Sequence, residues 1–195
     1  IFAEDIFEVT GRGFSPEGGF TLNGKTISPK NHQHLMLCLK IGALCNNGYV
    51  ENSNILGDST EIALLVAAKK AQPLESYAEK RTGEIPFSSE RKMMSTLNES
   101  AIKPRLYVKG APETVLKKCT RMYKNGRVAP LTPAEKRDTM ETLDINQREL
   151  ANRLGVSEGA VSKWLSGSRD IPSSKVKLFS DLLIESPEPH PVTQI

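Results

Sequence analysis

Short runs of alternating apolar and polar residues predict β-structure over residues 7–27. One such run is Phe7-Glu8-Val9-Thr10. Two more, Phe20-Thr21-Leu22 and Lys25-Thr26-Ile27, flank Asn23-Gly24, which is a dipeptide favoured in two-residue hairpin turns. Strand-like runs later in the chain are Met93–Leu97, Arg105–Val108 and the segments on either side of Asn125-Gly126.

Between these runs the apolar residues take up helical spacing. From Asn31 onward they fill most of a helix and leave little polar face, so we expect this helix to be well buried. A second helix opens after Gly57, with Asp58 or Ser59 as its cap. Pro112 suits the first position of a third helix. The combined pattern predicts an α+β fold, an antiparallel sheet flanked by helices.

A different, all-helical pattern follows residue 132. Thr132-Pro133-Ala134-Glu135 has the residues of a capping box with proline at the first helical position. This cap opens a first helix, and a pair of further amphipathic helices follows it. Gly155 separates the two helices of the pair, and Ser157 caps the second. Residues 133–185 are therefore predicted to form a small all-α unit, separate from 1–132, and the proline-containing residues 186–195 a disordered tail. The apolar positions of the two helices are Leu150, Ala151, Leu154, Val161, Trp164 and Leu165.

Composition changes this picture little. The chain has 195 residues, 25% of them charged, and a net charge of +3, an ordinary balance that does not by itself require a nucleic-acid partner. Three cysteines without a C-x-x-C spacing indicate reduced thiols in a cytosolic protein. No apolar run approaches the roughly 20 residues of a membrane span, and the first residues do not read as a signal peptide. Because there is no initiator Met, we expect the chain to be a fragment or a processed product.

Two histidines lie next to the start of the first helix. His32 and His34 form an H-x-H pair that is half of a possible metal site, with Cys38 one helical turn later. The favoured interpretation is a surface or capping role for the histidines and a buried structural thiol for Cys38. No protein-bound metal is predicted.

The segment Glu84–Met94 carries the clearest candidate chemistry. Phe87 precedes the charged pair Arg91-Lys92, so one strand edge presents an aromatic face and a cation a few residues apart. A nucleotide needs a ring for its base and positive charge for its phosphates. The alternative is a buried Phe at the start of an edge strand, followed by a solvated polar run.

Three segments in order carry a family resemblance. They are Gly57–Glu61, Phe87–Met93 and Val108–Glu113, with Leu44-Cys45-Asn46 before them and Cys119 and Asn125-Gly126 after them. Residues 6–133 thereby closely resemble the nucleotide-binding (N) domain of P-type cation-transporting ATPases of the calcium-pump and sodium-pump branch.

The resemblance implies an adenine-nucleotide site. Phe87 would stack on adenine and Glu61 would lie near its edge. Lys92 would lie along the nucleotide, and Lys109-Gly110 would form the floor of the pocket. The implied ligand is ATP, as Mg-ATP, bound by a cytoplasmic domain that makes no membrane contact of its own.

The resemblance also indicates what this chain lacks. The Asp-Lys-Thr-Gly-Thr phosphorylation motif is absent from the sequence, so we expect binding of ATP without hydrolysis. A further helix and a strand of Leu-Arg-Val-Leu-Ala type should follow Thr132 in this family, and they are not found.

Residues 133–185 resemble instead the helix-turn-helix domains of the Cro and C1 phage-repressor class. Such proteins bind DNA, usually as dimers, with the second helix of the pair in the major groove. Glu158 and Gly159 are unfavourable for that role, because one repels phosphate and the other has no side chain. The two modules imply a natural fusion, a gene-prediction accident or an engineered chimera. The positions that match base-facing residues are Glu158, Gly159, Ser162 and Lys163; Gln147 matches a phosphate contact, and Arg169, Lys175 and Lys177 add backbone contacts.

Overall fold

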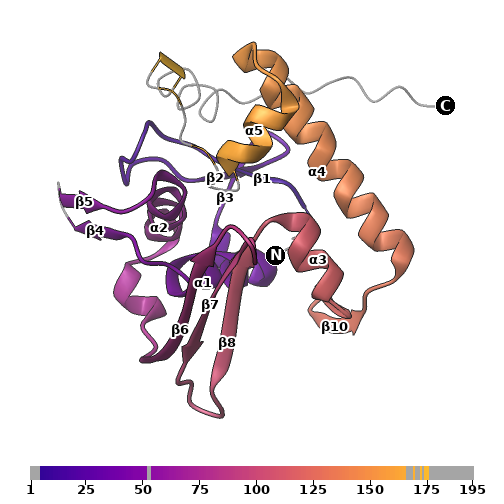
Figure 1. The fold of residues 1–195 in the computed structure, drawn as a ribbon. Helices are drawn as coiled ribbons and strands as arrows, with labels where there is room; N and C mark the ends of the chain where they lie inside the picture. Colours follow the sequence, from indigo (N-terminus) through magenta and orange to yellow (C-terminus); the bar gives the residue numbers. More distant parts are fainter. Residues whose placement is uncertain (1–4, 52–53, 166–168, 170–171, 173, 176–195) are drawn as a thin grey trace.

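The computed structural model describes residues 5–51, 54–165, 169, 172 and 174–175 (Figure 1). The fold is α+β, as predicted. The strands are β1 (Phe7–Val9), β2 (Phe20–Leu22), β3 (Lys25–Ile27), β4 (Tyr49–Glu51), β5 (Asn54–Leu56), β6 (Arg81–Ser88), β7 (Met93–Asn98), β8 (Arg105–Gly110), β9 (Arg121–Lys124) and β10 (Arg127–Pro130). The helices are α1 (Gln33–Leu44), α2 (Ser59–Ala71), α3 (Pro112–Lys118), α4 (Pro133–Leu154) and α5 (Glu158–Leu165), with 3-10 turns η1 (Pro29–Asn31) and η2 (Leu74–Tyr77).

The described strands form four small antiparallel sheets rather than the one sheet predicted. They are β1-β2-β3, β4-β5, β6-β7-β8 and β9-β10. Helices or turns separate the hairpins along the chain, and most strands outside β6–β8 have only three or four residues. Such short strands pair with the strand next to them in the sequence, and the resulting hairpins do not join into a larger sheet. The β4-β5 hairpin has no strong turn dipeptide, and the sequence did not reveal it.

Two hairpin turns confirm the local sequence signals. Asn23 and Asn125 have φ angles of 52° and 49°, and each is followed by a glycine at φ 72°. Consecutive positive φ angles are those of the type I′ turn, whose twist matches that of the flanking strands. The backbone at Asn23-Gly24 and Asn125-Gly126 therefore joins β2 to β3 and β9 to β10 directly.

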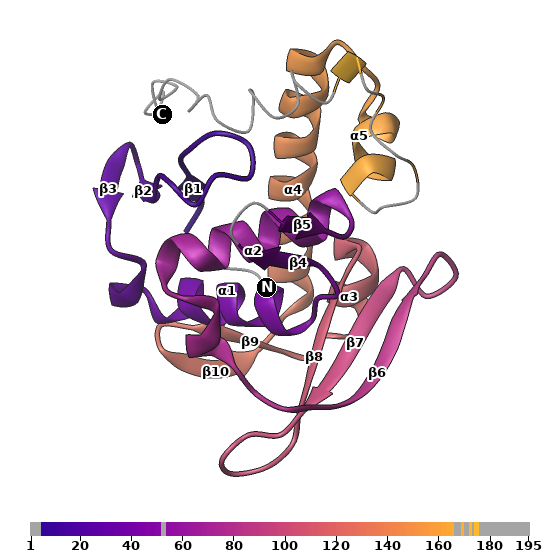
Figure 2. The ribbon, with the colours of Figure 1, turned by 90° about the vertical axis from the view of Figure 1, so that its left-hand side faces the viewer.

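Helix α1 lies between two apolar layers. Figure 2 shows α1 and α2 side by side, with β1–β3 on one side and β6–β8 on the other. This two-sided packing agrees with the predicted burial of the α1 segment. Cys38 is only half-buried, whereas Cys45 at the end of α1 is fully buried. One cluster contains Phe20, Leu35, Leu39, Ala68 and Tyr77, and the other contains Cys45, Met94 and Tyr107 with Ile41 and Leu44.

Helix α4 is one continuous helix where the sequence suggested two. Its capping box is confirmed, because Thr132 Oγ1 accepts from Glu135 N at 3.2 Å and Glu135 Oε2 accepts from Thr132 N at 2.9 Å. Hydrogen bonding to Thr132 lowers the pKa of Glu135, with the nearby Lys124 adding to the effect. No residue between Thr132 and Gly155 is a glycine or an internal proline, so nothing in the sequence interrupts the helix.

Gly155, at φ 61°, ends α4 in the left-handed conformation and turns the chain into α5. A separate apolar cluster holds the two helices together; its members are Ala151, Leu154, Val161 and Trp164. Lys175 Nζ donates to the carbonyl of Leu154 at 2.8 Å, so this lysine caps α4. Lys177 and the predicted tail lie outside the described residues. Helix α4 also packs against α3 (Figure 1).

Among the described helices, none has both the length and the apolar character needed to cross a membrane.

The cluster between α4 and α5 yields a stability prediction. Leu154→Ala should lower the free energy of unfolding of this helical hairpin by about 2–5 kcal/mol, because a side chain only 1% exposed leaves a cavity. Trp164, the one tryptophan in the sequence, reports the loss as a red shift of fluorescence at lower denaturant. Leu106→Ala is the control, since Leu106 is 62% exposed and its loss should change stability by less than about 0.5 kcal/mol. Equal midpoints for both variants would contradict the packing described.

Candidate functional site

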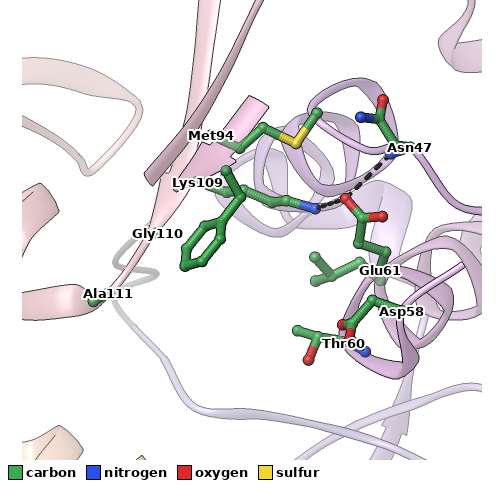
Figure 3. A pocket seen from close by; sticks show the side chains of 10 residues that line it. Asn47, Asp58, Thr60, Glu61, Met94, Lys109, Gly110 and Ala111 are labelled. Carbon is green, nitrogen blue, oxygen red and sulfur yellow. Dashed lines mark hydrogen bonds and ion pairs between the residues drawn. The ribbon is translucent and has the colours of Figure 1, made fainter. Parts of the chain in front are cut away.

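A cavity of about 410 Å³ lies between the N-terminus of α2 and the end of β8 (Figure 3). Its volume is within the range of small-molecule sites, and its walls are mainly apolar with a few polar groups. The residues that line it are Asn47, Asp58, Thr60, Glu61, Leu64, Phe87, Met94, Lys109, Gly110 and Ala111.

The first turn of α2 forms the acidic wall. Asp58 caps the helix, as predicted, by accepting from Thr60 N at 2.8 Å. The cap fixes where the helix begins and so turns Glu61, in the first turn, toward the cavity. Glu61 Oε1 accepts from the backbone N–H of Asn47 at 3.2 Å. The carboxylate is thus oriented from two elements before any ligand binds.

An ion pair joins this wall to the sheet. Lys109 Nζ on β8 lies 2.7 Å from Glu61 Oε1, and the two side chains are 21% and 17% exposed. Figure 3 shows both side chains meeting in the pocket. Because both charges are largely withdrawn from water, removing either would leave the other poorly solvated. The pair presents an acceptor and a donor next to each other.

Phe87 projects from an irregular part of β6. Ile85 pairs with Ser95, and the next pair is Ser88 with Met93. Two residues of β6 therefore lie opposite one residue of β7, which is a β-bulge. Such a bulge redirects side chains, and Pro86 is tolerated there because it has no N–H to donate to the ladder. Phe87 lines the cavity and stays 40% exposed. An exposed aromatic ring at a cavity wall is available for stacking on a ligand.

Gly110 ends β8 where the backbone passes very close to β7. A Cβ at this position would lie 2.3 Å from the carbonyl oxygen of Lys92 and 2.7 Å from Met93 Cγ. Glycine is therefore required by the sheet itself as well as by access to the cavity. The Lys92 carbonyl accepts from Ala111 N at 3.0 Å, which closes this corner.

Lys92 is the one predicted nucleotide-binding residue that does not line the cavity. Its Nζ lies 3.2 Å from Glu113 Oε1 on α3, and both side chains are exposed. Its backbone stands at the cavity edge beside Gly110, at a positive φ of 50°. The structure thus brings Glu61, Phe87, Lys109 and Gly110 together and places the Lys92 side chain just outside.

The sequence did not reveal the clamp that supports the pocket. Arg81 Nη1 donates to Asn47 Oδ1 at 2.7 Å and to Glu84 Oε2 at 3.1 Å, while Nη2 donates to the carbonyl of Leu44 at 2.9 Å. Asn47 Nδ2 in turn donates to Glu84 Oε1 at 2.6 Å. These bonds tie the loop after α1 to β6. No local signal marks an arginine for such a long-range contact.

The thiol of Cys45 is buried next to Met94, one of the residues that line the cavity. It contacts the carbonyl oxygen of Met94 at 3.6 Å, and burial raises its pKa, an effect that the charge of nearby Lys109 partly opposes. A neutral buried thiol is a poor nucleophile, so Cys45 serves packing here.

Comparison with known proteins agrees with this geometry. The family model for "P-type ATPase, cytoplasmic domain N" matches residues 34–168. The chain belongs to this N-domain family. The match starts within α1 and extends past α5, so it includes the helical hairpin as well as the pocket.

Calcium-transporting ATPases are among the relatives. The chain is 37% identical over 145 residues to the calcium-transporting ATPase of Bacillus subtilis, a match covering 70% of this chain and 16% of the relative. It is 30% identical over 159 residues to the calcium-transporting ATPase type 2C member 1 of Bos taurus, covering 77% and 16%. For type 2C member 2 of Rattus norvegicus it is 31% identical over 192 residues, covering 92% and 20%. The N domain described here thus spans at most about a fifth of these relatives.

Among the described residues, none of those predicted to contact DNA lines the cavity. Glu158, Gly159, Ser162 and Lys163 are exposed on α5, and Arg169 is exposed after it. Gln147 is half-buried on α4. The Glu158 carboxylate accepts from Arg148 Nε at 3.2 Å, so the first turn of α5 carries an ion pair.

Gly110 provides a test of how the pocket is built. Gly110→Ala should destabilise the N domain by about 1–3 kcal/mol or more, because the added methyl meets backbone that cannot move aside. Gly83→Ala is the matched control in the same sheet, since its Cβ would meet Leu97 Cβ at an ordinary 3.6 Å. Urea unfolding compares the two variants. If the unfolding midpoint of Gly110→Ala equals that of Gly83→Ala, the close approach of the backbone at Gly110 does not require glycine.

Proposed function

We propose that this chain is the adenine-nucleotide-binding domain of a P-type calcium-transporting ATPase and that it binds ATP without hydrolysing it. The observation that carries the proposal is the cavity in which exposed Phe87 faces solvent beside the half-buried Glu61–Lys109 pair. Calcium transport by the parent protein is inferred from the names of the relatives, and a cytoplasmic location of this domain from the description of the family.

The base is bound by stacking and by the ion pair. Phe87 offers a flat apolar face, and stacking on an aromatic ring contributes about 1–3 kcal/mol per base. Adenine has an amino group that donates and ring nitrogens that accept. Glu61 and Lys109 present the complementary acceptor and donor 2.7 Å apart.

The phosphates are assigned to the open side of the cavity. Lys92 has its backbone at the cavity edge and an exposed ammonium that is paired with the exposed carboxylate of Glu113. A surface ion pair of this kind is weak, so the lysine can exchange Glu113 for a phosphate oxygen at little cost. Gly110 and Ala111 leave room beside it.

Magnesium is assigned to the nucleotide rather than to the protein. Mg²⁺ prefers oxygen ligands and keeps several waters, and it commonly binds through substrate phosphates. In this cavity one oxygen of Asp58 caps α2 and Glu61 is paired with Lys109. The carboxylates are therefore already in use, and the ion would supply charge neutralisation while bound to ATP.

The expected affinity is modest. One stacked ring and a few polar contacts, less the cost of ordering the ligand, correspond to about 4 kcal/mol, or a Kd on the order of millimolar. Hydrolysis is not expected, because the Asp-Lys-Thr-Gly-Thr motif that carries the phosphorylated aspartate of the family is absent from this chain.

Phe87→Ala tests the nucleotide proposal. The variant should lose about 1–3 kcal/mol of binding, which is about 5- to 150-fold in Kd and strongly reduces the ATP-induced NMR shifts at millimolar ATP. Phe14→Ala is the matched control, since Phe14 is 41% exposed against 40% for Phe87 and does not line the cavity. Full ATP-induced shifts in Phe87→Ala would refute the assignment of the stacking ring.

DNA binding by the α4–α5 hairpin is the second candidate function. It is favoured by the tight left-handed turn at Gly155, by the separate apolar cluster and by the exposed first turn of α5. In this proposal residues 133–185 act as a helix-turn-helix unit and bind paired half-sites as a dimer. It ranks second, because the family match includes the same two helices and Glu158 brings negative charge to the proposed interface.

Selection from a random duplex library at low salt tests DNA binding. An enriched motif that Ser162→Ala or Lys163→Ala alters would support it, because base contacts at those positions carry the sequence preference. Leu106→Ala, on the exposed face of β8, is the control and should leave the selected motif unchanged. Absence of any enriched motif would eliminate the second candidate.

A further inference from the structure

A cluster of metal-ligating side chains lies outside the nucleotide pocket. Asp5, His32 and His34 each offer one ligand atom, and these three atoms all lie within 4.8 Å of one another. None of the three residues lines the cavity described above. The cluster joins the segment before β1 to the start of α1, since His32 is the residue immediately preceding that helix.

The histidines do not have the capping role that the sequence favoured. His32 occupies the N-cap position of α1, yet its side chain makes no capping hydrogen bond. Nε2 of His34 is shielded from solvent and has no hydrogen-bond partner among the residues that the structure describes. A buried ring nitrogen without a partner loses its hydration, and no hydrogen bond compensates for that loss. Such an atom calls for an explanation.

Phe7 holds the two imidazoles in place. Its ring centroid lies 5.1 Å from that of His32, nearly edge-on, and 5.4 Å from that of His34. The two imidazole centroids are 5.9 Å apart. An apolar ring packed against both histidines restricts their rotation and pre-orients their nitrogens toward Asp5.

The spacing suits a metal better than a hydrogen bond. His34 Nε2 and Asp5 Oδ2 are 3.7 Å apart, too far for a hydrogen bond. Two ligands about 2.1 Å from one tetrahedral ion are separated by about 3.4 Å. Asp5 is exposed and adjustable, so a small movement of its carboxylate brings the three atoms to that spacing.

The ligand types select the metal. Two imidazoles and one carboxylate suit zinc and similar first-row divalent ions, whereas Ca²⁺ and Mg²⁺ prefer oxygen ligands throughout. Three protein ligands leave the fourth tetrahedral position open to water. We propose that Asp5, His32 and His34 form a binding site for a zinc-class divalent ion, which links the N-terminal segment to helix α1.

Isothermal titration with ZnCl2 tests this site. The chain, stripped with a chelator and free of nucleotide, should bind one zinc ion. His34→Gln and His32→Gln should each weaken binding at least tenfold, since even loss of an outer-shell partner costs about 10–100-fold. Asp5→Asn should also weaken it. Calcium chloride should give no binding at the concentrations where zinc binds.

Two control variants separate this cluster from other zinc ligands. His190→Gln removes the remaining histidine of the chain, which lies outside the described residues, and should bind zinc normally. Cys38→Ser/Cys119→Ser should also bind normally. Unchanged ATP-induced NMR shifts in His34→Gln would show that the variant is folded. The proposal is overturned if the unaltered chain binds no zinc, if His34→Gln binds it as tightly, or if the cysteine variant loses it.

Discussion

The packing of helix α1 on both of its sides is the constraint that positions the two layers of the fold and the cavity between α2 and β8. Leu35 and Leu39 contact the layer of β1–β3 and α2, while Ile41 and Leu44 contact the layer of β7 and β8. Because protein interiors are close-packed, one helix buried on two faces fixes the distance and angle between the layers that it separates. The cavity proposed to bind nucleotide lies where α2 and β8 meet, so its shape follows from this packing.

Polar contacts then connect the elements that surround the cavity. The Glu61–Lys109 pair bridges α2 and β8, and Arg81 ties the loop after α1 to β6. Largely buried ion pairs are often no more stabilising than apolar side chains of similar size. Their presence around a cavity is better understood as preorganisation of donors and acceptors for a polar ligand. The proposed binding of ATP without hydrolysis needs this geometry and no nucleophile.

Separate apolar clusters divide the chain into parts with different roles. The α4–α5 hairpin has its own cluster around Leu154 and Trp164, and it contains none of the residues that line the cavity. The cluster of Asp5, His32 and His34 at the start of α1 likewise contains no residue that lines the cavity. A substitution in one part should therefore leave the stability and the binding of the other parts unchanged, because distant sites with no shared partners contribute additively.

The sequence by itself determined the features that depend on neighbouring residues. Asn23-Gly24 specified a hairpin, Asp58 a helix cap, and Thr132 with Glu135 a capping box, because each involves atoms only a few positions apart. The ordered motifs around Glu61, Phe87 and Lys109 indicated the family before any contact was known. Only the tertiary structure decided how these parts meet. It divided the strands into four sheets, joined two expected helices into α4, and paired Lys109 with Glu61 across 48 residues. Contacts over such separations depend on the packing of whole layers, and no local pattern encodes them.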